Sequence, residues 1–158
     1  MGTYDYTGDA VAGASPPNPF IGQAFRAPLY RRLKVSAIIA DNAVMKAAGF
    51  IAINDIVQAI HVKAGYSLDA CILRIITAGT ATVTAEVGLA GGAEGIGSTP
   101  VAMDAAAGTM YRTIEADTWD LGKVFTTNDT IDVQFLIANC AVGDFELFVM
   151  GNQLLLGV

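Results

Sequence analysis

Reactive side chains are scarce in this sequence of 158 residues. It has one histidine, His61, and two cysteines, Cys71 and Cys140, that stand far apart. A zinc site usually takes about four clustered nitrogen or sulfur ligands, and a Ser-His-Asp or Cys-His site would have to use His61. No recognisable signature surrounds that histidine. The sequence therefore predicts no metal site, no cofactor and no catalytic residue, and we expect His61 on the solvent or subunit-contact face of a strand.

Charge is also sparse, and long hydrophobic runs are absent. Charged residues make up 15% of the chain, against about 25% in a typical domain. Apolar residues make up 53%, so the whole chain does not have the composition of a disordered protein. No apolar run approaches the ~20 residues of a spanning helix, and the net charge of −6 opposes the basic balance of nucleic-acid binders. We expect no membrane span, no nucleic-acid partner and no small-molecule substrate.

The opening residues predict the compartment. Residues 1–6 have neither the basic n-region nor the apolar h-region of a signal peptide. We therefore expect synthesis in a cytoplasm without a signal peptide. In that reducing compartment the two cysteines, each within an apolar run, are expected to be buried free thiols. A disulfide between facing strands is the alternative.

What charge there is lies unevenly along the chain. Residues 1–74 carry seven basic and five acidic residues, and residues 75–158 carry two basic and ten acidic residues. Four of the basic residues, Arg26, Arg31, Arg32 and Lys34, lie close together. This cluster has two interpretations, a solvated basic loop or a docking segment for an acidic surface.

The first 31 residues differ from the rest of the chain. They hold four of the five prolines, several glycines and no period of 2 or 3.6, which predicts an extended arm. An arm in free solution gains nothing from large apolar side chains, so these should be buried on the chain's own domain or on a partner. Seven such residues are Tyr4, Tyr6, Phe20, Ile21, Phe25, Leu29 and Tyr30. We therefore divide the chain into an arm, 1–31, and a β-sandwich domain, 32–158.

From Arg32 onward, apolar and polar residues alternate in short runs separated by turn residues. This pattern favours an all-β sandwich or barrel of roughly eight strands. Residues 41–49 fit either a short helix, capped by Asp41 or Asn42 and ended by Gly49, or a loop leading into a strand at 50–53. Residues 88–109 are expected to form a Gly/Ala-rich loop with a short strand at 99–103. The other expected strands are 32–37, 56–62, 68–77, 80–87, 110–116, 123–126, 131–137 and 145–150.

Four stretches carry a family resemblance. They are Gly49-Phe50-Ile51-Ala52-Ile53-Asn54-Asp55-Ile56-Val57-Gln58-Ala59-Ile60, Val62-Lys63-Ala64-Gly65-Tyr66-Ser67-Leu68, Ile76-Thr77-Ala78-Gly79-Thr80-Ala81-Thr82-Val83 and Glu86-Val87-Gly88. With the Gly-rich loop at 90–99 that follows, the region resembles the head decoration (cement) proteins of tailed phages and related small phage structural proteins. Lys63 stands where proline is common in such proteins, and the loop has fewer aspartates than usual.

The resemblance implies a jelly-roll-like antiparallel β-sandwich with an extended N-terminal arm. It further implies a homotrimer on the outer capsid surface of a virion, binding the major capsid protein and stapling neighbouring subunits of the expanded shell. No catalytic residue carries over, so the chain is expected not to be an enzyme. The residues expected to contact the shell are Phe20, Phe25, Arg26, Leu29, Tyr30, Arg31 and Arg32.

Three other hypotheses stay open from the sequence. A carbohydrate-binding β-sandwich on a virion surface would need exposed aromatic residues, for which Tyr66, Tyr111 and Trp119 are the candidates. A small hydrolase would depend on His61 or on an acidic pair. A tail, baseplate or minor coat component would have the same kind of sequence as a decoration protein.

Overall fold

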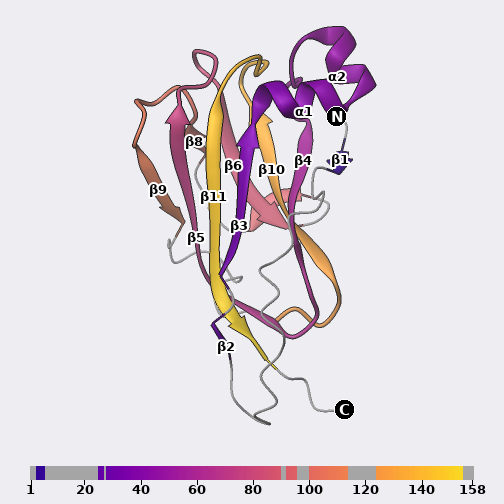
Figure 1. Cartoon of the computed structure of the whole chain (residues 1–158), viewed down its shortest axis with the longest axis vertical. Helices are drawn as coiled ribbons and strands as arrows, with labels where there is room; N and C mark the ends of the chain where they lie inside the picture. Colours follow the sequence, from indigo (N-terminus) through magenta and orange to yellow (C-terminus); the bar gives the residue numbers. More distant parts are fainter. Residues whose placement is uncertain are drawn as a thin grey trace.

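Two β-sheets face each other across one hydrophobic core (Figure 1). The computed structural model describes residues 3–5, 25–26, 28–89, 92–95, 100–113 and 124–154. Sheet A contains β1 (Thr3–Asp5), β4 (Ile56–Val62), β6 (Thr84–Leu89), β7 (Gly92–Gly95), β8 (Val101–Ala102) and β10 (Asp129–Leu136). Sheet B contains β2 (Phe25–Arg26), β3 (Leu29–Lys34), β5 (Tyr66–Thr77), β9 (Met110–Thr113) and β11 (Asp144–Gln153).

The strand order is that of a jelly roll. Among β3, β4, β5, β6, β8, β9, β10 and β11, the first strand pairs with the last, the second with the seventh, the third with the sixth and the fourth with the fifth. All four pairs are antiparallel. This nested pairing folds a long hairpin into two four-stranded sheets. The predicted fold class, a jelly-roll-like antiparallel β-sandwich, is confirmed.

Alternating side chains fill the space between the sheets. On β11, Phe145, Leu147 and Val149 are fully buried, and on the neighbouring β5, Leu73 and Ile75 are buried beside them. Side chains at every second position of a strand point to one face, so these residues form the core while their neighbours point outward. The register of β11 therefore decides which of its residues reach the surface.

The strand predicted at 32–37 is wrong in its second half. β3 ends at Lys34, and helix α1 (Val35–Asp41) follows directly. Val35 and Ile38 are both buried, and their spacing of three residues places them on one face of a helix. The N–H of Val35 donates to the carbonyl of Gly143 at 3.0 Å, so the chain leaves the sheet against the turn before β11.

The short helix expected within 41–49 is confirmed as α2 (Ala43–Ala48). The side-chain oxygen of Asn42 accepts hydrogen bonds from the N–H groups of Val44 (2.9 Å) and Met45 (3.1 Å). Gly49 ends the helix with φ +79°, a left-handed conformation that glycine adopts without strain. After it, Ile51 forms a single bridge to Cys140 where the alternative reading expected a strand at 50–53.

The remaining predicted strands differ mainly in their ends. β4 has the predicted bounds, and the short strand expected within 99–103 is β8. β6 begins at 84, because residues 80–83 form a turn in which Thr82 has φ +64°. In the region predicted as a strand at 123–126, Val124 makes one bridge to Ser67. No helix among the described residues is both long and apolar enough to cross a bilayer.

Candidate functional site

The outer face of sheet B exposes side chains of mixed chemistry. Tyr30, Met110 and Met150 are exposed on it, and Met110 shows 65% of its surface to solvent. Asp144 and Glu146 lie on the same face and are buried, at 8% and 9% exposure. We call the outward residues of sheet B the open face. They are Tyr30, Arg32, Lys34, Ile72, Arg74, Met110, Arg112, Asp144, Glu146, Phe148 and Met150.

Two arginines on the open face are held by carboxylates of β11. Arg32 donates from Nε to Oδ1 of Asp144 at 2.9 Å and from Nη2 to Oδ2 at 2.5 Å. Arg74 forms an ion pair with Glu146 from the opposite side of β11. The hydroxyl of Tyr30 donates to Oε1 of Glu146 at 2.9 Å. The forked bond to Asp144 fixes the plane of the Arg32 guanidinium.

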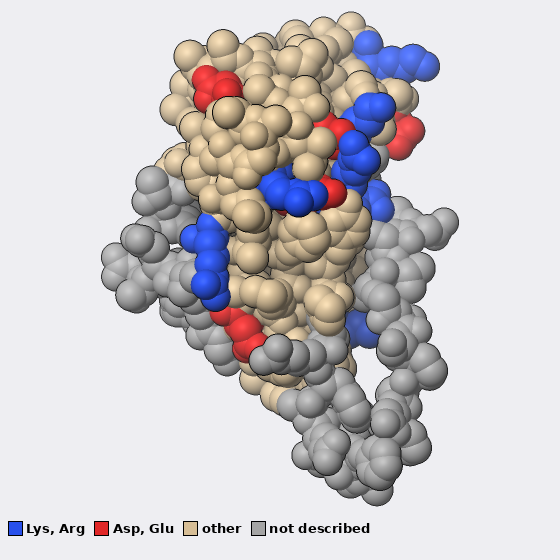
Figure 2. Space-filling model, turned by 60° about the vertical axis from the view of Figure 1, so that its left-hand side comes forward, with Lys and Arg blue, Asp and Glu red and all other residues tan. Residues whose placement is uncertain are grey.

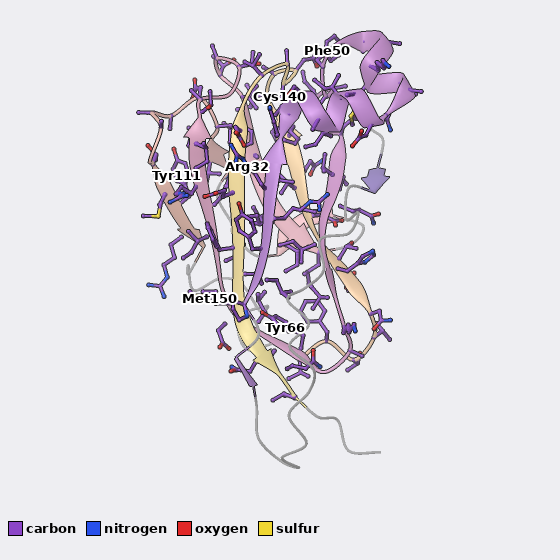
Figure 3. All side chains as sticks on the ribbon, in the orientation of Figure 1. Arg32, Phe50, Tyr66, Tyr111, Cys140 and Met150 are labelled. Atoms are coloured by element: carbon purple, nitrogen blue, oxygen red, sulfur yellow. The ribbon has the colours of Figure 1, made fainter. Side chains whose placement is uncertain are left out.

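Next to these ion pairs lies an aromatic and aliphatic centre. The rings of Tyr30 and Phe148 lie 5.0 Å apart, and the guanidinium of Arg74 lies 5.9 Å from the centroid of Phe148. Aromatic residues and arginine are enriched in protein interfaces, where they supply large contact areas and hydrogen bonds together. Figure 3 shows Arg32 toward one end of the sheet and Met150 toward the other, so the face extends along most of β11.

The two sheets carry opposite charge. The strands of sheet A contain five acidic residues and, within their described bounds, neither lysine nor arginine. The strands of sheet B contain six basic and three acidic residues. Figure 2 shows basic and acidic side chains lying together across a largely uncharged surface. A chain of net charge −6 thus gathers its positive charge on one sheet.

The ion pairs also set the protonation of the open face. The hydrogen bonds from Arg32 hold the pKa of the Asp144 carboxyl below its usual range. Burial, with the hydrogen bond to Glu146 second, raises the pKa of the Tyr30 phenol. Asp144 therefore stays ionised and Tyr30 stays protonated across the neutral range.

Two of the seven predicted contact residues lie on the open face, Tyr30 and Arg32. Leu29 is buried in the core, and Arg31 is half-buried on the inward side of β3. Leu29, Tyr30 and Arg31, which the division of the chain placed in the arm, thus form the first half of a sandwich strand.

The other three predicted contact residues precede that strand. Phe25 and Arg26 form β2, whose backbone pairs with the end of β11. Phe20 lies outside the described residues. Sequence reasoning missed Arg74 and Phe148, although both stand at polar-side positions of strands that it predicted.

The structure gives less support to the residues that the competing hypotheses would need. Tyr66 is only 2% exposed, so it is no platform for a sugar, and Tyr111 packs against the core. Trp119 lies outside the described residues. His61 is exposed on β4, as predicted. Within the described part of the chain, no group of three or more His, Cys, Asp or Glu residues could hold a metal ion.

The two cysteines are free and buried, as expected. Burial raises the pKa of the Cys140 thiol to about 11. A thiol of that pKa is almost entirely protonated at neutral pH, and the thiolate is the reactive form. Cys140 therefore behaves as a small core residue, with its Sγ 3.4 Å from the carbonyl oxygen of Val142.

Two solved structures of phage capsids share this architecture. A chain in the capsid of Ralstonia phage GP4 matches with a TM-score of 0.54 and 15% identity, over 87% of this chain and 89% of that one. A chain in the acid-stable capsid of Helicobacter pylori bacteriophage KHP30 matches with a TM-score of 0.50 and 14% identity, over 81% and 87%. The fold is one found in phage capsids. No protein-family model and no curated protein matches the sequence.

Proposed function

We propose that this chain is a virion structural protein, a decoration protein that binds the outer head lattice of a tailed phage. In this role it staples neighbouring major capsid subunits and stabilises the expanded shell, as a homotrimer and without catalysis. The observation that carries the proposal is the open face, a sheet surface that gathers basic, aromatic and aliphatic side chains on a fold found in two phage capsids.

The open face has the properties of a docking surface for an acidic partner. It carries four basic and two acidic side chains, so it is positive on a chain that is negative overall. Its acidic residues hold Arg32 and Arg74 in place, which lowers the entropy lost when these side chains bind. Charge of this kind speeds association and selects the partner, while the exposed Met110, Tyr30 and Met150 supply apolar contact area.

The residues before β3 are proposed to extend this contact. β2 pairs with the last residues of β11, so the end of the arm joins the edge of sheet B. Phe20, Phe25 and Arg26 would then reach the same shell surface as the open face. Each contact would be modest, but many copies on one lattice would gain stability together through avidity.

Charge reversal on the open face tests the proposal. The double variant Lys34→Glu/Arg112→Glu inverts two exposed charges outside the two ion pairs, and should lower binding to heads that lack this protein by about tenfold or more. The matched control, Lys46→Glu/Lys63→Glu, changes the net charge equally at exposed sites off the open face. Co-sedimentation with purified heads measures both. Equal binding by the two double variants would contradict the proposed docking face.

A truncation tests the arm separately. Leu29 is buried and β3 pairs with β11, so the deletion should stop at residue 24 to keep the eight jelly-roll strands. It removes β1, the short strand that pairs with β4 at the edge of sheet A. The chain from 25 to 158 should keep its β-sheet circular dichroism and cooperative unfolding but load poorly onto heads. Normal loading of this truncated chain would remove the arm from the docking surface.

A further inference from the structure

The ion pairs of the open face keep their acceptors inside and their donors outside. The side chain of Asp144 is only 11% exposed, whereas that of Arg32 is 55% exposed, and both oxygens of Asp144 accept from Arg32. The pair of Arg74 and Glu146 is arranged in the same way. The other oxygen of Glu146 accepts from the hydroxyl of Tyr30. A partner that docks here therefore meets mainly hydrogen-bond donors, and it must supply acceptors.

Arg32 has one edge of its guanidinium still available. Each of two edges of a guanidinium can hold a carboxylate through a pair of parallel hydrogen bonds. Asp144 takes the edge formed by Nε and Nη2, at 2.9 and 2.5 Å. The edge formed by Nη1 and the second hydrogen of Nη2 has no partner within the described part of the chain. Because Asp144 fixes the plane of the group, this free edge has a defined direction on the half-exposed side chain.

Apolar side chains lie beside this edge. Tyr30 is two residues before Arg32 on β3, so the two side chains are neighbours on the same face (Figure 3). The ring of Tyr30 lies 5.0 Å from that of Phe148, and Met150 follows two positions later on β11. An apolar residue of a partner protein can pack on these side chains while an acceptor next to it reaches Arg32. A nucleic-acid backbone also pairs with arginine, but the net charge of −6 repels a long polyanion.

We propose that the free edge of Arg32 binds a side-chain carboxylate of the shell through two parallel hydrogen bonds, with Asp144 as the positioning residue. The shell segment that docks here carries an aspartate or glutamate next to an apolar side chain. This inference rests on the proposed function, because it names what the open face recognises on the shell. A forked pair has a fixed geometry, so it orients the protein on the lattice, which scattered surface charges do only loosely.

Arg32→Lys tests the fork without changing the charge. A lysine presents a single ammonium, which cannot hold Asp144 and a second carboxylate in one plane. Binding to heads that lack this protein should therefore weaken about tenfold, as measured by co-sedimentation. Arg112→Lys is the matched control, because Arg112 is exposed on the same face outside both ion pairs. It keeps the charge that Arg112 contributes and should change binding by less than about twofold.

Asp144→Asn separates positioning from charge, because the two predict opposite effects. The variant makes the open face more positive, so attraction by charge alone should tighten binding to an acidic shell. It also releases the guanidinium of Arg32, so binding through a fixed fork should weaken by about threefold or more. Circular dichroism and thermal unfolding of the same preparation check that the variant is folded at the temperature of the binding assay.

Three results would overturn the inference while the wild-type chain still binds heads. They are equal binding by Arg32→Lys and Arg112→Lys, tighter binding by Asp144→Asn than by the wild-type chain, and displacement of the wild-type chain from heads by excess double-stranded DNA. The last result would mean that the open face recognises phosphate rather than carboxylate. Failure of the proposed function would look different, as a wild-type chain that does not bind heads, and it would overturn this inference as well.

Discussion

Gly151 lies at a close approach of β11 to β5. A Cβ atom at this position would lie 2.7 Å from the ring of Tyr66 and closer still to the carbonyl oxygen of Ser67. The backbone oxygen cannot move without breaking the strand pairing, which already shifts register between Met150 and Gly151. We therefore expect Gly151→Ala to lower the free energy of unfolding by about 1–3 kcal/mol. Urea denaturation measures this, with Met150→Ala, on the exposed side of the same strand, as a control that should change stability much less.

Asp144 makes the stability of the open face depend on pH. Arg32 depresses the pKa of this carboxyl in the folded chain, so the unfolded chain takes up the proton more readily. The stabilisation is therefore present above the ordinary carboxyl pKa of about 3.9 and is lost as pH falls through the lower folded value. Asp144→Asn should lower the free energy of unfolding by roughly 0.5–1 kcal/mol at pH 7, a small figure because solvent screens the half-exposed Arg32.

A pH series distinguishes the loss of the Arg32–Asp144 ion pair from the general effect of removing one negative charge. The difference in stability between wild type and Asp144→Asn should shrink below about pH 4, because the wild-type carboxyl then becomes protonated as well. Asp41→Asn, which removes an exposed carboxylate from α1, should stay close to wild type across the series. A difference for Asp144→Asn that stays constant from pH 7 down to pH 2 would contradict the role given to the Arg32 pair.

At the scale of elements, helix α2 depends on its cap. The helix has only six residues, so it forms because Asn42 binds two free N–H groups at its start and Met45 is buried beneath it. Asn42→Ala should lower the free energy of unfolding by about 1 kcal/mol. Asn42→Ser keeps a side-chain oxygen at the cap and should restore most of that loss. Equal losses for the two variants in thermal unfolding would show that the cap contributes little.

Elements with a local cause could be predicted from the sequence. Asn42 and Gly49 mark the start and the end of α2 in the sequence, and the apolar run of β4 indicates its bounds. Helix α1 was missed because Leu33, Val35 and Ala37 alternate as a strand would, while Val35, Ile38 and Ile39 also fit a helix face. In the fold, the N–H of Val35 donates to Gly143, which is distant in the sequence, and Val35 and Ile38 are buried together on the helix face.

The open face could also be predicted only in part, because it too depends on contacts between residues distant in the sequence. Tyr30 and Arg32 could be predicted because they stand in a basic and aromatic cluster of the sequence. Arg74 and Phe148 become part of the site only through the register of β11. This strand pairs on one side with β3, more than a hundred positions earlier in the sequence, and on the other side with β5. Strand pairing over such distances depends on the whole fold and leaves no local pattern.

At the scale of the molecule, docking on heads through the open face should weaken as the salt concentration rises. Docking through the positive open face depends on charge, so raising the NaCl concentration from 50 to 500 mM should weaken binding to heads by shortening the Debye length from about 14 to about 4 Å. Binding to heads that stayed level from 50 to 500 mM NaCl would show that docking does not depend on charge, and the open face would then not be the docking surface.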